Sequence, residues 1–141
     1  MTERPGVLTV LLVEDNAGDV YMVREAMEEA GLSYDLHVVD TGIKAMEYLH
    51  HRGQFSAAPH PDLVILDLNL PAKTGQEIMA EMEASPTLCE VPVAVLTTSR
   101  SESGICRRYP HLRSVFAPKT PAVHELVAIV KRFDEFARNP K

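Results

Sequence analysis

The run of apolar residues from Leu63 to Leu66 ends directly at the carboxylate of Asp67. Such an uninterrupted run, with β-branched side chains and turn residues around it, is typical of a strand buried on both faces of a sheet. Turn and breaker residues follow, namely Asn69, Pro71 and Gly75. A buried parallel strand that ends in an acid places this acid at the carboxyl edge of a sheet, where open α/β sheets have their binding crevice. Taken alone, Asp67 is better explained as a cap of the next helix, so its meaning depends on the other segments.

Strand-like and helix-like segments alternate along the whole chain. The predicted strands are residues 8–13, 35–39, 63–66, 91–97 and 115–117. The predicted helices are residues 17–30, 41–51, 75–84 and 121–138. Between the last two strands, residues 100–110 have little apolar periodicity, and we expect a helix there to be short or mobile. The alternation predicts a doubly wound α/β fold, with five parallel strands covered by helices on both faces.

Length and composition exclude several classes of protein. With 141 residues, 45% of them apolar and 24% charged, we expect one domain over residues 1–141 and no output domain. The net charge of -6 argues against nucleic-acid binding, which needs a basic face. Two cysteines, Cys89 and Cys106, are too few for a disulfide scaffold and match no zinc spacing, so we expect reduced thiols in a cytoplasmic protein. No apolar run approaches the length of a membrane span, and no signal peptide is evident.

Acidic residues follow two of the predicted strands. Glu14 and Asp15 come after the first strand, and Asp67 comes after the third. These strands are neighbours in a doubly wound sheet, so three carboxylates are expected to converge at one edge. Two unit charges about 5 Å apart, at an effective dielectric constant of about 20, repel by roughly 3 kcal/mol. Such a cluster needs a cation, and oxygen ligands with open positions suit Mg²⁺.

A hydroxyl run and a lysine follow the other two strands at the same edge. Thr97 ends the fourth strand, and Lys119 comes just after the fifth. Each is unremarkable alone, because threonines are common in strands and lysines on surfaces, while acids such as Glu14 favour helix N-termini. Their joint placement at four strand ends favours a site. Acids, a hydroxyl and an ammonium suit the transfer of a phosphoryl group onto Asp67.

The chain resembles a receiver domain of a response regulator, the phosphorylated partner in two-component signalling. The resemblance covers nearly the whole chain and rests on residues 11–16 (LLVEDN), residues 66–71 (LDLNLP) with Gly75, residues 96–99 (LTTS), and Lys119. It implies a flavodoxin-like (βα)5 fold with strand order 2-1-3-4-5. The run VEDN followed by Gly-Asp, together with LDLNLP and LTTS, is also similar to the single-domain regulators that serve phytochrome-type histidine kinases.

The resemblance implies a role for each matching residue. Asp67 is the implied phosphoacceptor, and a sensor histidine kinase such as a bacteriophytochrome is the implied donor. Mg²⁺ is expected on the carboxylates of Asp15 and Asp67, on the backbone carbonyl of Asn69 and, through water, on Glu14. Thr97 and Lys119 are expected to contact the phosphoryl group, and Phe116 falls on the family's aromatic switch position. In one departure from the family, Thr120 rather than proline follows Lys119, which leaves open how this lysine is aimed.

Three other interpretations compete with phosphorylation-dependent signalling. A Mg²⁺-dependent phosphohydrolase of the haloacid dehalogenase type needs an acid two residues after the nucleophile, where this chain has Asn69. A flavin or nucleotide carrier needs a phosphate loop after the first strand, and Glu14 and Asp15 repel phosphate. A pseudo-receiver that signals without phosphate is disfavoured by the intact acids but kept open by Thr120. The downstream target is expected to be a protein that this chain contacts directly.

The last predicted helix has more apolar surface than one core contact needs. Val123, Val127 and Val130 form one stripe, and Ile129, Phe133 and Phe136 lie on the adjoining arc. The combined face is about 180° wide, against about 100° for a helix that packs on a core. We therefore expect a homodimer in which Ile129, Phe133 and Phe136 lose exposure to the partner. The alternative is that residues 100–110 or the chain terminus cover these apolar side chains.

Overall fold

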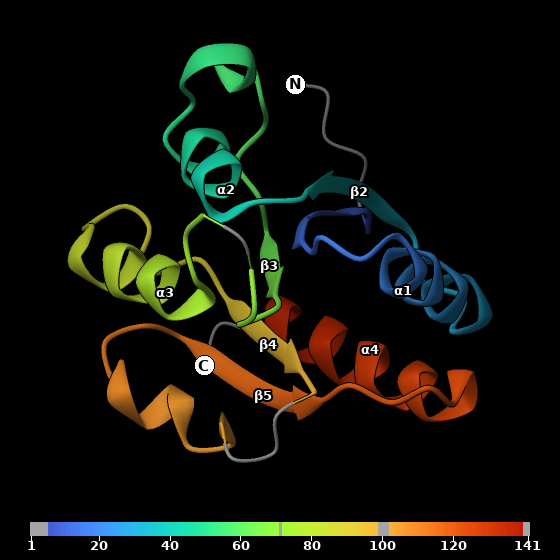
Figure 1. The fold of residues 1–141 in the computed structure, drawn as a ribbon. Helices are drawn as coiled ribbons and strands as arrows, with labels where there is room; N and C mark the ends of the chain where they lie inside the picture. Colours follow the sequence, from blue (N-terminus) through green and yellow to red (C-terminus); the bar gives the residue numbers. More distant parts are fainter. Residues whose placement is uncertain (1–5, 71, 99–101, 140–141) are drawn as a thin grey trace.

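The computed structural model describes residues 6–70, 72–98 and 102–139. Five parallel strands form one sheet in the order β2-β1-β3-β4-β5 (Figure 1). Their bounds are β1 Leu8–Val13, β2 Tyr34–Val39, β3 Leu63–Leu66, β4 Val93–Thr97 and β5 Ser114–Pro118. The fold class and the strand order predicted from the sequence are therefore confirmed.

Helices cover both faces of this sheet. In Figure 1, α1 (Ala17–Glu29) and α4 (Val123–Arg138) lie on one side, and α2 (Gly42–Leu49) and α3 (Gly75–Ala84) lie on the other. Strand side chains point alternately to the two faces, so Leu11 of β1 joins one core cluster while Leu12 joins the other. This explains why β1, β3 and β4 read as continuous apolar runs, because both of their faces are buried.

The elements agree with the predicted ones more closely in type than in their bounds. The second helix ends at Leu49 rather than at residue 51, and the last begins at Val123 because Ala122 has an extended backbone and acts as its N-cap. In the predicted weak segment, the described helical turn is the short 3₁₀ helix η3 (Ile105–Arg108). Residues 100 and 101 of that segment lie outside the described part of the chain.

The prediction for the face of α4 was wrong at its central residue. Phe133 is fully buried and packs in the core cluster beneath α1 and α4, together with Leu126 and Val130. The stripe that packs on the sheet therefore consists of residues 126, 130 and 133. The predicted stripe consisted of residues 123, 127 and 130. Phe133 has no exposure to lose to a partner, while Ile129 and Phe136 are only half-buried.

The register of the parallel strands determines where along the sheet each strand ends. Val13 of β1 lies opposite Leu66 of β3, so Glu14 and Asp67 follow at the same level. The backbone N–H of Asp67 donates to the carbonyl of Val13 at 3.1 Å, and that of Glu14 donates to the carbonyl of Val39 at 3.0 Å. The backbone at both acids is thus fixed by the neighbouring strand.

Candidate functional site

The three carboxylates predicted to converge at the carboxyl edge lie together. Glu14, Asp15 and Asp67 each offer one oxygen, and these oxygens lie within 4.8 Å of one another. Glu14 and Asp67 are buried, whereas Asp15 is exposed. Glu14 accepts a hydrogen bond from the N–H of Asn16 at 3.2 Å, and Asp67 accepts one from the N–H of Asn69, also at 3.2 Å. Local backbone donors therefore orient both buried acids.

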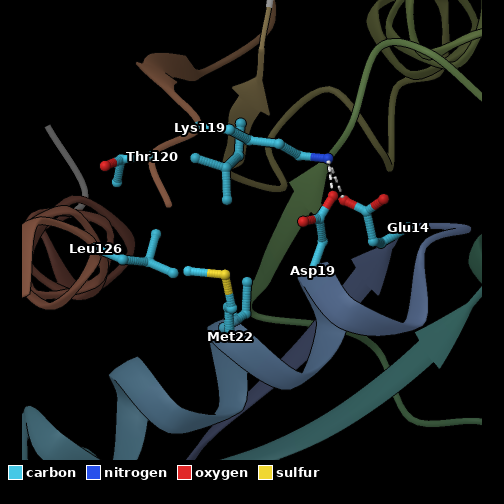
Figure 2. A pocket seen from close by; sticks show the side chains of 8 residues that line it. Glu14, Asp19, Met22, Lys119, Thr120 and Leu126 are labelled. Carbon is cyan, nitrogen blue, oxygen red and sulfur yellow. Dashed lines mark hydrogen bonds and ion pairs between the residues drawn. The ribbon is translucent and has the colours of Figure 1, made fainter. Parts of the chain in front are cut away.

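Lys119 reaches this cluster from the end of β5. Its ammonium nitrogen lies 2.8 Å from Glu14 Oε1, 2.8 Å from Asp19 Oδ2 and 3.2 Å from Asp67 Oδ2. The backbone N–H of Lys119 donates to the carbonyl of Thr97 at 2.8 Å, which fixes the start of the side chain at the end of β4. Figure 2 shows the ammonium directed at Asp19 and Glu14.

The threonine that replaces the family's proline stabilises the turn after Lys119. The hydroxyl of Thr120 accepts a hydrogen bond from the N–H of Ala122 at 3.1 Å and donates one to Glu125. No cis peptide bond occurs among the described residues. Lys119 nevertheless contacts the acids. The hydrogen bonds of the Thr120 hydroxyl stabilise the backbone next to Lys119, at the start of α4.

The other predicted residues lie around the cluster at different depths. Thr97 is completely buried at the end of β4, next to β5. Phe116 of β5 is opposite Val95 and is half-buried against the core on the α3 side of the sheet. Asn69 is exposed in the loop that follows Asp67. Ile129 and Phe136, the remaining dimer candidates, lie far along α4 and do not belong to the acidic cluster.

Burial and charge shift the protonation equilibria of the site in two ways. Burial raises the pKa of Glu14 above its ordinary value, and the charge of Asp67 adds to this shift, while the hydrogen bond from Lys119 offsets part of it. Burial alone would lower the pKa of Lys119. The hydrogen bonds to Asp19 and Glu14 and the charge of Asp67 outweigh burial and raise that pKa. The lysine is therefore positively charged at neutral pH.

The donor set fits a magnesium ion. Within the described residues of the site, four carboxylates (Glu14, Asp15, Asp19 and Asp67) face one ammonium, so negative charge remains uncompensated. Two of the three clustered acids are buried, where unpaired charge is costly, and their oxygens are the ligands that Mg²⁺ prefers. The exposed Asp15 leaves one side open to water, which Mg²⁺ usually retains.

The start of α3 packs tightly on the loop that follows Asp67. Thr74 and Glu77 form a capping box at this helix start, and the N–H of Gly75 donates to the carbonyl of Leu68 at 3.1 Å. A Cβ atom at position 75 would lie 2.6 Å from the Cα of Leu68 and 2.8 Å from the carbonyl oxygen of Asp67. Only glycine therefore allows this approach to the backbone of the candidate phosphoacceptor.

Asp19 also lies at the site, although no motif in the sequence predicted a role for it. Asp19 lies in the first turn of α1, and its N–H donates to the side chain of the N-cap Asn16 at 3.0 Å. The signal was present, because an acid in the first turn of the helix that follows Glu14 and Asp15 remains at the same sheet edge. Its pairing with a lysine 100 residues away depends on the tertiary fold.

Five parallel strands with acids, a hydroxyl and a lysine at their carboxyl edge define a receiver-type α/β protein. The sequence model of the response regulator receiver domain matches residues 10–131, and this chain belongs to that family. The family consists generally of signalling proteins rather than enzymes, and a histidine kinase is the implied partner.

Response regulators, one of them a phytochrome response regulator, are among the similar proteins. The response regulator Rcp1 of Synechocystis sp. is 34% identical over 90% of this chain and 86% of its own length. The phosphorylated cyanobacterial phytochrome response regulator RcpA has 36% identity and a TM-score of 0.82, covering 95% of this chain and 96% of its own. The Mn²⁺-bound form of Rcp1 has 33% identity and a TM-score of 0.79, covering 92% of this chain and 93% of its own.

No described helix has the length and apolar character to cross a membrane.

Proposed function

We propose that this chain is a response regulator with one receiver domain, phosphorylated on Asp67 by a sensor histidine kinase in a Mg²⁺-dependent reaction. The observation that carries the proposal is the buried carboxylate of Asp67, which lies within a cluster of three acids and 3.2 Å from the ammonium of Lys119. This arrangement combines a nucleophile, a cation site and a positive charge that can follow the incoming phosphoryl group.

Each residue has a distinct task in the proposed transfer. A carboxylate oxygen of Asp67 attacks phosphorus, and the bond from phosphorus to the kinase histidine breaks, with the electron pair staying on the histidine nitrogen. Lys119 donates to a phosphoryl oxygen, and the hydroxyl of Thr97 donates to another. Asp15 and Asp67, the backbone carbonyl of Asn69 and, through water, Glu14 would hold Mg²⁺, which would supply charge neutralisation.

The likeness to RcpA supports a phytochrome-type kinase as the donor, because RcpA is a phytochrome response regulator and is similar to this chain over nearly its whole length. The phosphorylated domain is proposed to signal by contacting another protein. Thr97 and Phe116 lie on the paired strands β4 and β5, which suits a switch in which Thr97 moves toward the phosphoryl group and Phe116 fills the vacated space.

A homodimer through α4 remains part of the proposal, with two of the three predicted apolar contacts. Phe133 is excluded because it is buried, which leaves Ile129 and Phe136 as apolar contacts, with Arg132 and Arg138 at the exposed rim. Light scattering of the phosphorylated chain at high concentration tests this point. A chain that stays monomeric under that condition contradicts the dimer and leaves the phosphoacceptor proposal intact.

Intact mass after incubation with acetyl phosphate tests the proposed function. The wild type is expected to gain one phosphoryl group with Mg²⁺ and none after chelation, and Asp67→Asn is expected to gain none. Asp40→Asn is the matched control, because Asp40 follows the neighbouring strand β2 and pairs with Lys44 instead. Thr97→Ala is expected to accept phosphate but to show a smaller change in hydrogen exchange around η3. A wild type without any adduct would favour a pseudo-receiver.

A further inference from the structure

Asp19 contacts the catalytic lysine without belonging to the cluster of potential metal ligands. Its Oδ2 lies 2.8 Å from the ammonium nitrogen of Lys119, as close as Glu14 and closer than Asp67. Among the described residues, the acids that can share one cation are Glu14, Asp15 and Asp67. Asp19 is also the most exposed of the three partners of Lys119, with 37% of its side chain accessible. It therefore pairs with the lysine from outside the cation site.

The ammonium of Lys119 has three N–H donors, and the three carboxylates occupy all of them. Two of these carboxylates, Glu14 and Asp67, are also the buried members of the cluster expected to hold a divalent cation, Asp67 directly and Glu14 through water. A cation and an ammonium that share the same oxygens repel each other. A bound cation would therefore draw these two carboxylates away from Lys119 and leave Asp19 as its partner.

The surroundings of Asp19 give the lysine space on that side. Figure 2 shows Asp19 and Met22 on α1 facing Lys119, Thr120 and Leu126 across a small pocket. The pocket has a volume of about 20 Å³, which is enough for one water molecule. The ammonium can thus turn toward α1 without displacing the packed side chains of the core.

We propose that Asp19 is a positioning residue that holds the ammonium of Lys119 on the α1 side while a divalent cation occupies the three acids. The inference rests on the proposed function, because it concerns the same acidic site. Without Asp19, the described carboxylate partners left to Lys119 are Glu14 and Asp67, so the lysine competes with the cation for its ligands. Asp19 thereby lets the cation and the ammonium be present together before the phosphoryl group arrives.

A double-mutant cycle on cation affinity tests this role. Mn²⁺ affinity is measured by calorimetry at fixed salt for the wild type, Asp19→Asn, Lys119→Met and the double variant. In the Lys119 background, Asp19→Asn should weaken binding about fivefold, as expected for a partly exposed ion pair worth about 1 kcal/mol. With Met at position 119, the same change should weaken binding less than about twofold, because only through-space attraction is lost. Asp40→Asn is the control for charge and should change affinity less than about twofold in both backgrounds.

The outcomes separate this inference from the proposed function. Equal weakening by Asp19→Asn in both backgrounds would overturn the positioning role, while a wild type that binds no cation would overturn the proposed site as a whole. If Lys119→Met does not fold, NMR of the Lys119 ammonium replaces the cycle. With Mg²⁺ bound, the ammonium signal should stay protected from exchange in the wild type and be lost in Asp19→Asn. An identical signal in both proteins contradicts the inference.

Discussion

Replacing Gly75 with alanine should destabilise the chain by acting on the backbone of the site. The new Cβ would lie 2.6 Å from the Cα of Leu68, whereas ordinary contacts begin at 3.4 Å. The backbone of α3 or of the loop after Asp67 must therefore shift by about 0.8 Å, given how densely interiors are packed. The carbonyl oxygen of Asp67, 2.8 Å from the new atom, must move as well.

The size of the effect follows from two opposing contributions. Overpacking typically costs about 1–3 kcal/mol, and a clash with backbone belongs at the upper end of this range. Alanine is favoured over glycine in a helix interior by at most about 1 kcal/mol, and by less at the first helical position that Gly75 occupies. The net loss for Gly75→Ala should be about 2 kcal/mol, which corresponds to a decrease in Tm of roughly 6–8 °C for a chain of this size.

Urea unfolding and phosphate uptake test this prediction together. Gly104→Ala is the matched control, because a Cβ at position 104 meets no atom within 4 Å and its φ of -89° suits any residue. The control should change stability by less than about 0.5 kcal/mol. Gly75→Ala should also slow phosphorylation by acetyl phosphate at least about tenfold, because the nucleophile is displaced. Equal stability of the two variants would show that the contact with Leu68 is not tight in solution.

Two further predictions concern the core. Phe133→Ala should cost about 3–5 kcal/mol in urea unfolding, because the ring is fully buried, and Phe136→Ala should cost less than half as much; the opposite order would restore the packing predicted from the sequence. Burial, with a contribution from the charge of Asp35, raises the pKa of Tyr48 to about 12. Because this folded-state pKa lies above the unfolded value of about 10, the associated stability is present below pH 10 and is lost as the pH rises toward 12, so unfolding of Tyr48→Phe should depend less steeply on pH in this window.

The sequence predicted the sheet well because its central strands have an unambiguous pattern. The run from Leu63 to Leu66 is buried on both faces, as its continuous apolar pattern between turn residues indicated. The acids, Thr97 and Lys119 could be placed at one edge because parallel strands all end there. The strand pattern thus contained most of the information about the site.

Predictions failed where two tertiary arrangements fit the same local pattern. The apolar face of α4 offers neighbouring stripes, and only its angle against α1 and the sheet decides that Phe133 points inward. The pairing of Asp19 with Lys119 likewise depends on how α1 packs against α4, whose start follows Lys119, and helix periodicity does not encode this. Thr120 departs from the family pattern, but its hydroxyl forms two hydrogen bonds, one of them with the N–H two residues ahead as in an ST turn.

The site is assembled from parts that a ribosome makes at very different times. Glu14, Asp15 and Asp67 are all present once β3 has been made, whereas Lys119 follows only at the end of β5. During synthesis, the carboxylates can therefore meet before their ammonium exists. Until β5 docks, the described site residues provide no positive charge of their own. A divalent ion at these acids would then offset part of the repulsion between the ends of β1 and β3 in the growing chain.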